Sequence, residues 1–215
     1  MTGGLQLVDL RITLNGRRLV ALSTRIGAGE VLAVMGPSGS GKSSLLAALT
    51  GTLPPAFHLS GRILLDGQDI SDLPVQRRRM GLLFQDDLLF PHMSVAENLA
   101  FALPAAVSRV ERAGRIADAL AAMELAGLGP RDPATLSGGQ RARVALARCL
   151  ISEPRALLLD EPFARLDADL KRLIRPLVFD HARERNLPVI LVTHDPADAE
   201  AAGGRILSPL GEPVA

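Results

Sequence analysis

The 215-residue chain lacks tryptophan and tyrosine, and six phenylalanines supply its whole content of these three aromatic types. Since 47% of the residues are nevertheless hydrophobic, we expect an aliphatic core of Leu, Val, Ile and Ala. A single cysteine, Cys149, excludes an internal disulfide. It lies in the apolar stretch VALARCLI, which favours a small buried core residue.

Long apolar runs and an excess of charge are also missing. No uncharged stretch approaches the roughly 18 to 20 residues that a membrane span needs. Asp9 and Arg11 interrupt the N-terminal region, which does not resemble a secretory signal. The net charge of +1 argues against nucleic acid as a partner. We therefore expect a cytoplasmic protein that reaches a membrane only through another chain.

Short apolar segments alternate with helical patterns along the chain. Strand-like runs are expected at 5–14, 18–26, 29–36, 60–70, 79–85, 156–160 and 188–194, and helices at 42–49, 94–127 and 167–186. Such alternation predicts an α/β fold with a mostly parallel sheet that is covered on both faces. We predict a single domain over 1–215, with a core at 1–86 and 151–215 and a helical insertion at about 87–150.

Residues 36–43 read GPSGSGKS and fit the phosphate-binding pattern G-x-x-x-x-G-K-[ST] in full. The segment follows a predicted strand and precedes a predicted helix, which is the context that the pattern requires. The glycines let backbone N–H groups surround a phosphate, and Lys42 is one of only two lysines in the chain. The Ser43 hydroxyl is a candidate ligand of Mg²⁺. A glycine-rich turn without a ligand is the alternative, which the full match disfavours.

Polar side chains also stand at the ends of three other predicted strands. Asp160 and Glu161 end ALLLD, where Asp160 would hold Mg²⁺ and Glu161 would polarise an attacking water. His194 ends PVILVTH and would contact that water or the γ-phosphate. Gln85 ends RMGLLFQ and would touch Mg²⁺ or the water. Taken singly, the acidic pair could serve only the next helix start, and His194 could be structural.

The stretch LSGGQ, residues 136–140, precedes another helical segment. Ser137 and Gln140 form a capping box, which explains a helix start but not the two glycines between them. Glycine costs a helix interior about 1 kcal/mol relative to alanine, so the glycines point to close approach of another molecule. Free N–H groups at a helix start suit an anion. Because residues 36–43 already provide one phosphate site, this second site suits a nucleotide held by a different molecule.

These motifs occur in the order found in the ATP-binding subunits of ABC transporters, which the chain resembles over about residues 5 to 208. The text QRRRMGLLFQDDLLFPHMSVAENLAFAL is most similar to the subunits of bacterial importers for thiamine, polyamines, iron or sulfate. The resemblance implies ATP and Mg²⁺ as ligands and a fold with an antiparallel β subdomain and a helical signature subdomain. The ATP-binding residues that it implies are Gly36, Pro37, Ser38, Gly39, Ser40, Gly41, Lys42, Ser43, Ser44, Ser137, Gly138, Gly139, Gln140 and Asp167.

The same resemblance implies several partners. Two subunits, identical or related, would pack head to tail, so that residues 137–139 contact the γ-phosphate held by the other copy. The segment from Gln85 to Met93 would contact a membrane permease, although ordinary core packing explains its apolar residues nearly as well. A periplasmic solute-binding protein would act through the permease. The subunit would then be peripheral, on the cytoplasmic side of the inner membrane.

The chain departs from the family pattern in three places. An aromatic residue that stacks on adenine is expected near position 13, but Thr13 stands there. Adenine would then stack on an arginine such as Arg11 or Arg17, or be held loosely. The turn after Glu161 reads Ala164-Arg165-Leu166-Asp167, where the family usually has serine in place of Ala164. The sequence also ends soon after His194, so we expect no regulatory domain. Two alternatives stay open, a soluble ABC-type ATPase unrelated to transport and a P-loop kinase for a small molecule.

Overall fold

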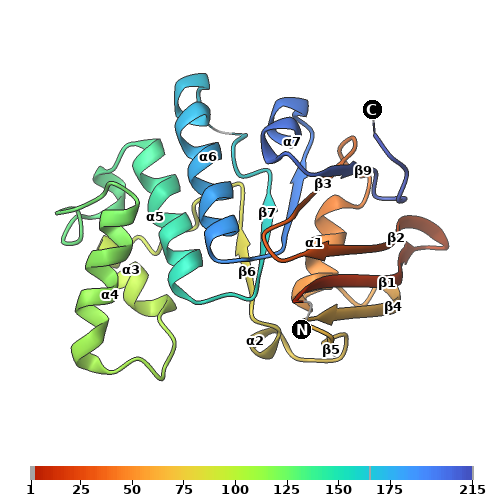
Figure 1. Cartoon of the computed structure of the whole chain (residues 1–215), viewed down its shortest axis with the longest axis horizontal. Coiled ribbons are helices and arrows are strands. Elements are labelled where there is room, and N and C mark those ends of the chain that lie inside the picture. The colour runs from red at the N-terminus through yellow and green to blue at the C-terminus, as the bar shows by residue number, and fades with distance from the viewer. Residues whose placement is uncertain (1–2, 165, 215) are drawn as a thin grey trace.

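The computed structural model describes residues 3–164 and 166–214, which form two sheets and a set of helices (Figure 1). The first sheet is antiparallel, with strand order β2-β1-β4-β5. Its strands are β1 (Gly4–Leu14), β2 (Arg17–Gly27), β4 (Phe57–Leu65) and β5 (Gln68–Asp69). The turn predicted at Asn15-Gly16 joins β1 to β2, with both residues at positive φ. The expected antiparallel β subdomain is thus present.

The second sheet has five parallel strands in the order β6-β7-β8-β3-β9. They are β6 (Met80–Leu83), β7 (Ala156–Asp160), β8 (Val189–Thr193), β3 (Val31–Met35) and β9 (Arg205–Leu207). The predicted parallel sheet is confirmed, and sequence patterning missed only the short strand β9. The carboxyl ends of β3, β6, β7 and β8 carry the phosphate-binding motif and the three other predicted site segments. Parallel strands bring these ends to one edge of the sheet.

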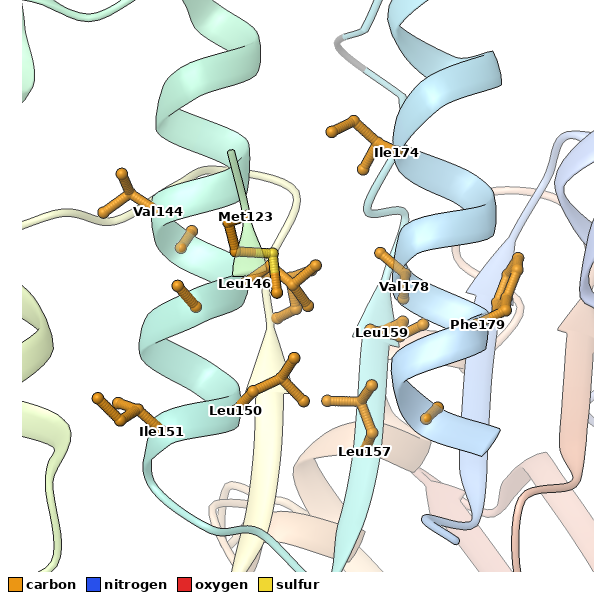
Figure 2. Packing of buried hydrophobic residues seen from close by; sticks show 14 of the residues in the cluster. Met123, Val144, Leu146, Leu150, Ile151, Leu157, Leu159, Ile174, Val178 and Phe179 are labelled. Carbon is orange, nitrogen blue, oxygen red and sulfur yellow. The ribbon is translucent and has the colours of Figure 1, made fainter. Parts of the chain in front are cut away.

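Both faces of the parallel sheet are buried, because alternate residues of each strand face different cores. In β7, Leu157 and Leu159 face a core that contains α5 and α6, while Ala156 and Leu158 face a core that contains α1 and the antiparallel sheet. Figure 2 shows Leu157 and Leu159 lying between α5 and α6. Leucine, valine and isoleucine dominate both cores, as the composition predicts.

The helices connect and cover the sheets (Figure 1). They are α1 (Lys42–Thr50), α2 (Val75–Arg78), α3 (Val95–Ala102), α4 (Arg109–Ala122), the 3-10 turn Pro133–Thr135, α5 (Gly138–Ile151), α6 (Ala168–Glu184) and α7 (Pro196–Ala202). The helices expected at 42–49 and 167–186 are confirmed within two residues at each end. Three helices, α3, α4 and α5, follow β6 before the chain returns to the sheet at β7.

The prediction of continuous helix over 94–127 is wrong, because the chain leaves the helix at Leu103–Ser108. Pro104 lacks the N–H that a continuing helix would need. Ser108 then starts α4 with a capping box of its own, in which its hydroxyl accepts from the Glu111 N–H. Helical spacing places Val110, Ala113, Ala117 and Leu120 on one face and predicts that this face is buried. In the structure Val110 is 90% exposed, Ala113 and Ala117 are exposed, and only Leu120 of this row is buried.

No helix in the described ranges is both long and apolar enough to cross a bilayer.

Candidate functional site

The phosphate-binding motif connects β3 to α1, as predicted. The Lys42 side chain is buried, and its Nζ donates to the carbonyl oxygens of Gly36 (2.7 Å) and Pro37 (3.1 Å). An ammonium group carries three donors, so these bonds aim Lys42 into the loop while leaving it capacity for a phosphate oxygen. The Lys42 ammonium group is therefore a compact positive charge enclosed by the backbone of the phosphate-binding loop.

The glycines of the loop are required by its shape. Gly41 has φ 103°, and a Cβ atom there would approach the Leu19 carbonyl oxygen to 2.9 Å. A Cβ atom on Gly36 would lie 2.9 Å from the Ser40 hydroxyl oxygen. That hydroxyl is buried and has no hydrogen-bond partner among the described residues. A buried polar group without a partner is costly in the folded protein. The loop therefore has the geometry and the donor capacity of an anion cradle.

One hollow of about 360 Å³ brings the loop together with an acidic strand end. Ser38, Lys42 and Ser43 line it on one side, and Glu161 reaches it from the end of β7. Gly39, Gly41 and Ser44 belong to the same lining. The structure thus gathers most of the predicted phosphate-binding residues and Glu161 around a single space.

The two acidic residues after β7 differ in environment. Asp160 is half-buried, and burial together with the neighbouring Glu161 carboxylate raises its pKa, against the opposing charge of Lys42. Glu161 has φ 45°, and its N–H donates to the Val192 carbonyl oxygen (2.9 Å). This backbone bond ties the turn after β7 to β8. The strained turn directs the Glu161 carboxylate into the hollow.

Glu161 and His194 meet across the sheet edge. The His194 Nδ1 atom lies 3.0 Å from Glu161 Oε2, and the His194 side chain is 62% exposed. A carboxylate beside an imidazole is a usual arrangement for holding or moving a proton. The ends of β7 and β8 are therefore in contact through Glu161 and His194, and Glu161 of this pair lines the hollow at the phosphate-binding loop.

A polar network holds the chain on both sides of His194. The Thr193 hydroxyl accepts from the Asp195 N–H (3.0 Å) and donates to Asp198 (3.1 Å). Arg175 of α6 donates to Asp198 through Nε (2.8 Å), and Lys171 of α6 binds Asp195 (2.9 Å). The Lys171 bond lowers the pKa of Asp195. These contacts fix the loop that carries His194 against α6.

The residues present fit a magnesium ion. Ser43 and Asp160 provide oxygen ligands of the kind that Mg²⁺ prefers, beside a loop suited to phosphates. A cation would also offset the repulsion between Asp160 and Glu161 that raises the Asp160 pKa. Across residues 3–164 and 166–214, no three His, Cys, Asp or Glu side chains gather into a cage. Magnesium sites commonly use one or two carboxylates and complete their coordination with water and phosphate oxygens.

Gln85 lies at a second hollow rather than at the first. It lines that space together with Gly138 of the LSGGQ stretch and Pro162, which follows Glu161. The segment after Gln85 is tied to α5, because Arg141 binds Asp87 (3.2 Å) and Arg148 donates to the Leu88 carbonyl oxygen (2.8 Å). The structure thus links the Gln85 segment to the LSGGQ helix.

The LSGGQ stretch forms the predicted capping box at the start of α5. Ser137 Oγ accepts from the Gln140 N–H (3.2 Å), and Gln140 Oε1 accepts from the Ser137 N–H (3.0 Å). A Cβ atom on Gly139 would lie only 2.5 Å from the Leu170 Cδ2 atom of α6. Packing against Leu170 therefore gives a local reason for glycine at position 139, and contact of its backbone with another molecule stays a prediction. Gly138 is exposed and has room for a Cβ atom, so packing does not account for it.

Asp167 is the N-cap of α6, where its side chain accepts from the Leu170 N–H (2.8 Å). Asp167 and Ala164 are both exposed, and the Ala164 N–H donates to the Glu161 carbonyl oxygen (3.1 Å). Arg165, part of the predicted departure from the family turn, lies outside the described residues. Helix capping is a complete local account of Asp167.

Sequence reasoning missed three residues at the first hollow. Leu14, Leu19 and Phe57 complete its lining. Among the described residues that line this space, neither Arg11 nor Arg17 appears, so both are poor candidates for stacking on a base. Phe57 escaped notice because it is distant in sequence from Thr13 and comes near only through strand pairing.

Comparison with known proteins gives a consistent result. Residues 19–164 match the family model described as ABC transporter. The chain is 46% identical over 194 residues to the uncharacterized ABC transporter ATP-binding protein YnjD of Escherichia coli K12, covering 90% of this chain and 89% of that protein. It is 48% identical over 181 residues to the thiamine import ATP-binding protein ThiQ of Cereibacter sphaeroides, covering 84% and 77%.

Among solved structures, the chain is similar to cbiO1 of Clostridium perfringens, described as part of the ABC transporter complex cbiONQ. The TM-score is 0.84 at 31% sequence identity, with 97% of this chain and 85% of that chain covered.

Proposed function

The chain belongs to the ATP-binding proteins of the ABC transporter family, and from this premise we propose that two copies close around two ATP molecules and hydrolyse them to drive solute import. The observation that carries the proposal is the hollow where Lys42, Ser43 and Glu161 meet. Lys42 provides a positive charge for the phosphates, Ser43 a hydroxyl ligand for Mg²⁺, and Glu161 a carboxylate that can orient a water molecule. This set of groups is the one that phosphoryl transfer to water needs.

Binding starts at the loop over residues 36–44. Its backbone N–H groups and the N-terminus of α1 face the phosphates, and Lys42 turns from the Gly36 and Pro37 carbonyls towards the β- and γ-phosphates. Ser43 and Asp160 would hold Mg²⁺, and Gln85, which lines the second hollow, would need to move to reach it. When bound, the ion neutralises charge on the phosphate oxygens.

Hydrolysis uses the contact between Glu161 and His194. The Glu161 carboxylate orients the attacking water and accepts its proton as the bond to phosphorus forms. The His194 Nδ1 atom lies 3.0 Å from that carboxylate, which leaves its Nε2 atom to contact the attacking water once the nucleotide is bound. The network through Thr193 keeps the imidazole at this position.

The proposal needs a second copy because the LSGGQ stretch is distant from the phosphate-binding loop of the same chain. None of the described residues 137–140 lines the hollow at Lys42, and Figure 1 shows α5 and α1 on opposite sides of β6 and β7. The free N–H groups around Gly138 therefore suit the γ-phosphate of a partner's ATP. Hydrolysis removes the charge that holds the two copies together.

The permease would dock on an apolar groove between β6, α3 and α5. Its lining includes three exposed apolar side chains, Phe84 (45%), Leu88 (53%) and Phe101 (66%). Arg148 of α5 lies over the Phe90 ring and binds the backbone of the Gln85 segment at Leu88. A partner bound in this groove would contact the segment that follows Gln85 in the sequence.

Import through a permease and a periplasmic binding protein is supported by the names of relatives such as the thiamine import ATP-binding protein. The chain would then lie peripherally on the cytoplasmic side of the membrane.

The Glu161→Gln variant tests the function. We expect it to bind ATP with unchanged affinity and to lose nearly all turnover, because an amide cannot accept the water's proton. It should also form an ATP-dependent dimer, which size-exclusion chromatography with bound-nucleotide analysis would measure. Glu200→Gln on the exposed face of α7 is the matched control and should stay active. Full turnover by Glu161→Gln would refute the assignment of Glu161.

The same trapped dimer tests the signature contact. Adding Ser137→Arg to Glu161→Gln should abolish the dimer while leaving monomeric ATP binding in place. Adding Ser108→Arg is the control, because Ser108 caps α4 through the same kind of capping box. Loss of the dimer with both substitutions would show that damage to a helix cap, rather than to a nucleotide contact, is responsible.

A further inference from the structure

The lining of the hollow at Lys42 combines two chemically different groups of residues. The phosphate-binding loop is polar, and Leu14, Leu19 and Phe57 are apolar. A ligand that contacts both groups has a phosphate tail and a flat or apolar body. The proposed function gives roles to the polar residues of this hollow but none to Phe57.

Strand pairing brings Phe57 to the hollow. Leu14 at the end of β1 is paired with Phe57 at the start of β4, and the next pair on the same face is Ile12 with Leu59. Directly opposite residues share a face of the sheet, so Leu14 and Phe57 continue the row of Ile12 beyond the buried core. Ile12 is fully buried, whereas Leu14 and Phe57 are half-buried. The apolar face of the antiparallel sheet therefore extends to the phosphate-binding loop.

Phe57 is supported by the protein core. Its side chain packs against the core shared by α1 and the antiparallel sheet. The Phe57 N–H donates to the Pro54 carbonyl oxygen (3.0 Å), which closes a turn containing two prolines, Pro54 and Pro55. Proline restricts the backbone of this turn. A supported aromatic ring beside an anion site is a ready platform for a planar group.

We infer that Phe57 is the residue on which the nucleobase of the bound nucleotide stacks, with Leu14 and Leu19 completing an apolar clamp. This inference rests on the proposed nucleotide-binding function and adds a specificity residue to it. The clamp offers an aromatic face and two aliphatic side chains, none of which donates or accepts a strong hydrogen bond. Stacking is tolerant of base identity. The site therefore accepts GTP nearly as well as ATP.

The test compares three ligands by isothermal titration with Mg²⁺ present: ATP, GTP and inorganic tripolyphosphate. We expect Phe57→Ala to weaken binding of ATP and of GTP by about ten-fold, the loss typical of one base–aromatic stack, and to leave tripolyphosphate unchanged. Phe57→Leu keeps an apolar side chain against the core and controls for folding, with the same expected pattern. Equal weakening of all three ligands, or no change in any of them, would overturn the inference.

A second measurement uses the lack of tryptophan in the chain. Phe57→Trp introduces a single tryptophan, whose fluorescence ATP and GTP should quench and tripolyphosphate should not. Phe101→Trp on α3 is the control and should show no quenching by the base. Failure of the unmodified protein to bind ATP would instead refute the proposed function. ATP binding by that protein with an unquenched Phe57→Trp would refute this inference alone.

Discussion

At the scale of single residues, neighbouring carboxylates after β7 have different tasks because their surroundings differ. Asp160 is half-buried at the strand end, and burial together with Glu161 raises its pKa. Glu161 reaches the hollow and contacts His194. Ionised Asp160 therefore costs the protein folding stability when no cation balances it, which is common for groups kept for a ligand.

The Asp160→Asn variant measures that cost. The folded-state pKa is raised, so at pH 7 folding buries a charge that the amide avoids, and the variant should melt at a higher temperature without nucleotide. Below the unfolded-state pKa of about 3.9, Asp160 is neutral in both states and the difference should vanish. Between that value and the raised folded pKa, the stability contributed by Asp160 increases as the pH falls. Thermal melts from pH 7 to pH 4 would show the trend.

Asp69→Asn is the matched control for that experiment. Bonds from Ser71 lower the pKa of Asp69, so its charged form is favoured in the folded state. This substitution should leave stability at pH 7 unchanged or reduce it. A gain in melting temperature from both substitutions would mean that net charge, and not the burial of Asp160, sets the effect.

At the scale of helices and strands, the two glycines at the start of α5 look alike in the sequence but have different surroundings. Gly139 packs against Leu170, whereas Gly138 faces open space. Gly139→Ala should therefore destabilise the fold by about 1 to 3 kcal/mol through overpacking, and adding Leu170→Ala should relieve the clash. Gly138→Ala should preserve stability or raise it by up to about 1 kcal/mol. Urea denaturation would measure both effects.

The activity of these variants separates packing from ligand contact. If a partner's ATP approaches Gly138, Gly138→Ala should slow ATP hydrolysis even though the fold is as stable as before. Equal activity of Gly138→Ala and the unmodified protein would argue against close approach at this position. Loss of stability in Gly138→Ala would instead contradict the open space seen beside it.

The sequence predicts this level of structure well where the signal is local. The loop at 36–43, the strands ALLLD and VILVT and the capping box of Ser137 and Gln140 depend on neighbouring residues and lie where expected. The role of Phe57 and the reason for Gly139 depend on contacts with β1 and α6, which periodicity does not report. The outward face of α4 was misjudged because small apolar residues such as Ala113 and Ala117 signal burial weakly, and both are exposed.

At the scale of the whole molecule, the groove beside Gln85 and the hollow at Lys42 are linked through the parallel sheet. The groove is lined by β6 residues and by Phe101. Strand β6 pairs with β7, which ends at Asp160 and Glu161. A partner in the groove is therefore connected to the reacting groups by one hydrogen-bonded layer. Coupling of this kind needs an element with two arrangements that both sites bias.

Phe101→Glu tests the groove as the permease surface. We expect this variant to keep its basal ATPase rate, because Phe101 is 66% exposed and far in the fold from the phosphate-binding loop, and to lose co-purification with its permease. Val110→Glu replaces a side chain on α4 that is 90% exposed and outside the groove, and it should keep the permease. Retention of the permease by Phe101→Glu would place the docking surface elsewhere.

The contact between Gly139 and Leu170 also has an evolutionary consequence. A Cβ atom at position 139, in the LSGGQ stretch, would need space that the Leu170 side chain in the first turn of α6 now fills. A lineage that acquires alanine at position 139 is therefore expected to favour a smaller or differently shaped residue at position 170. Among related sequences, these two alignment columns should change together, as spatial neighbours do.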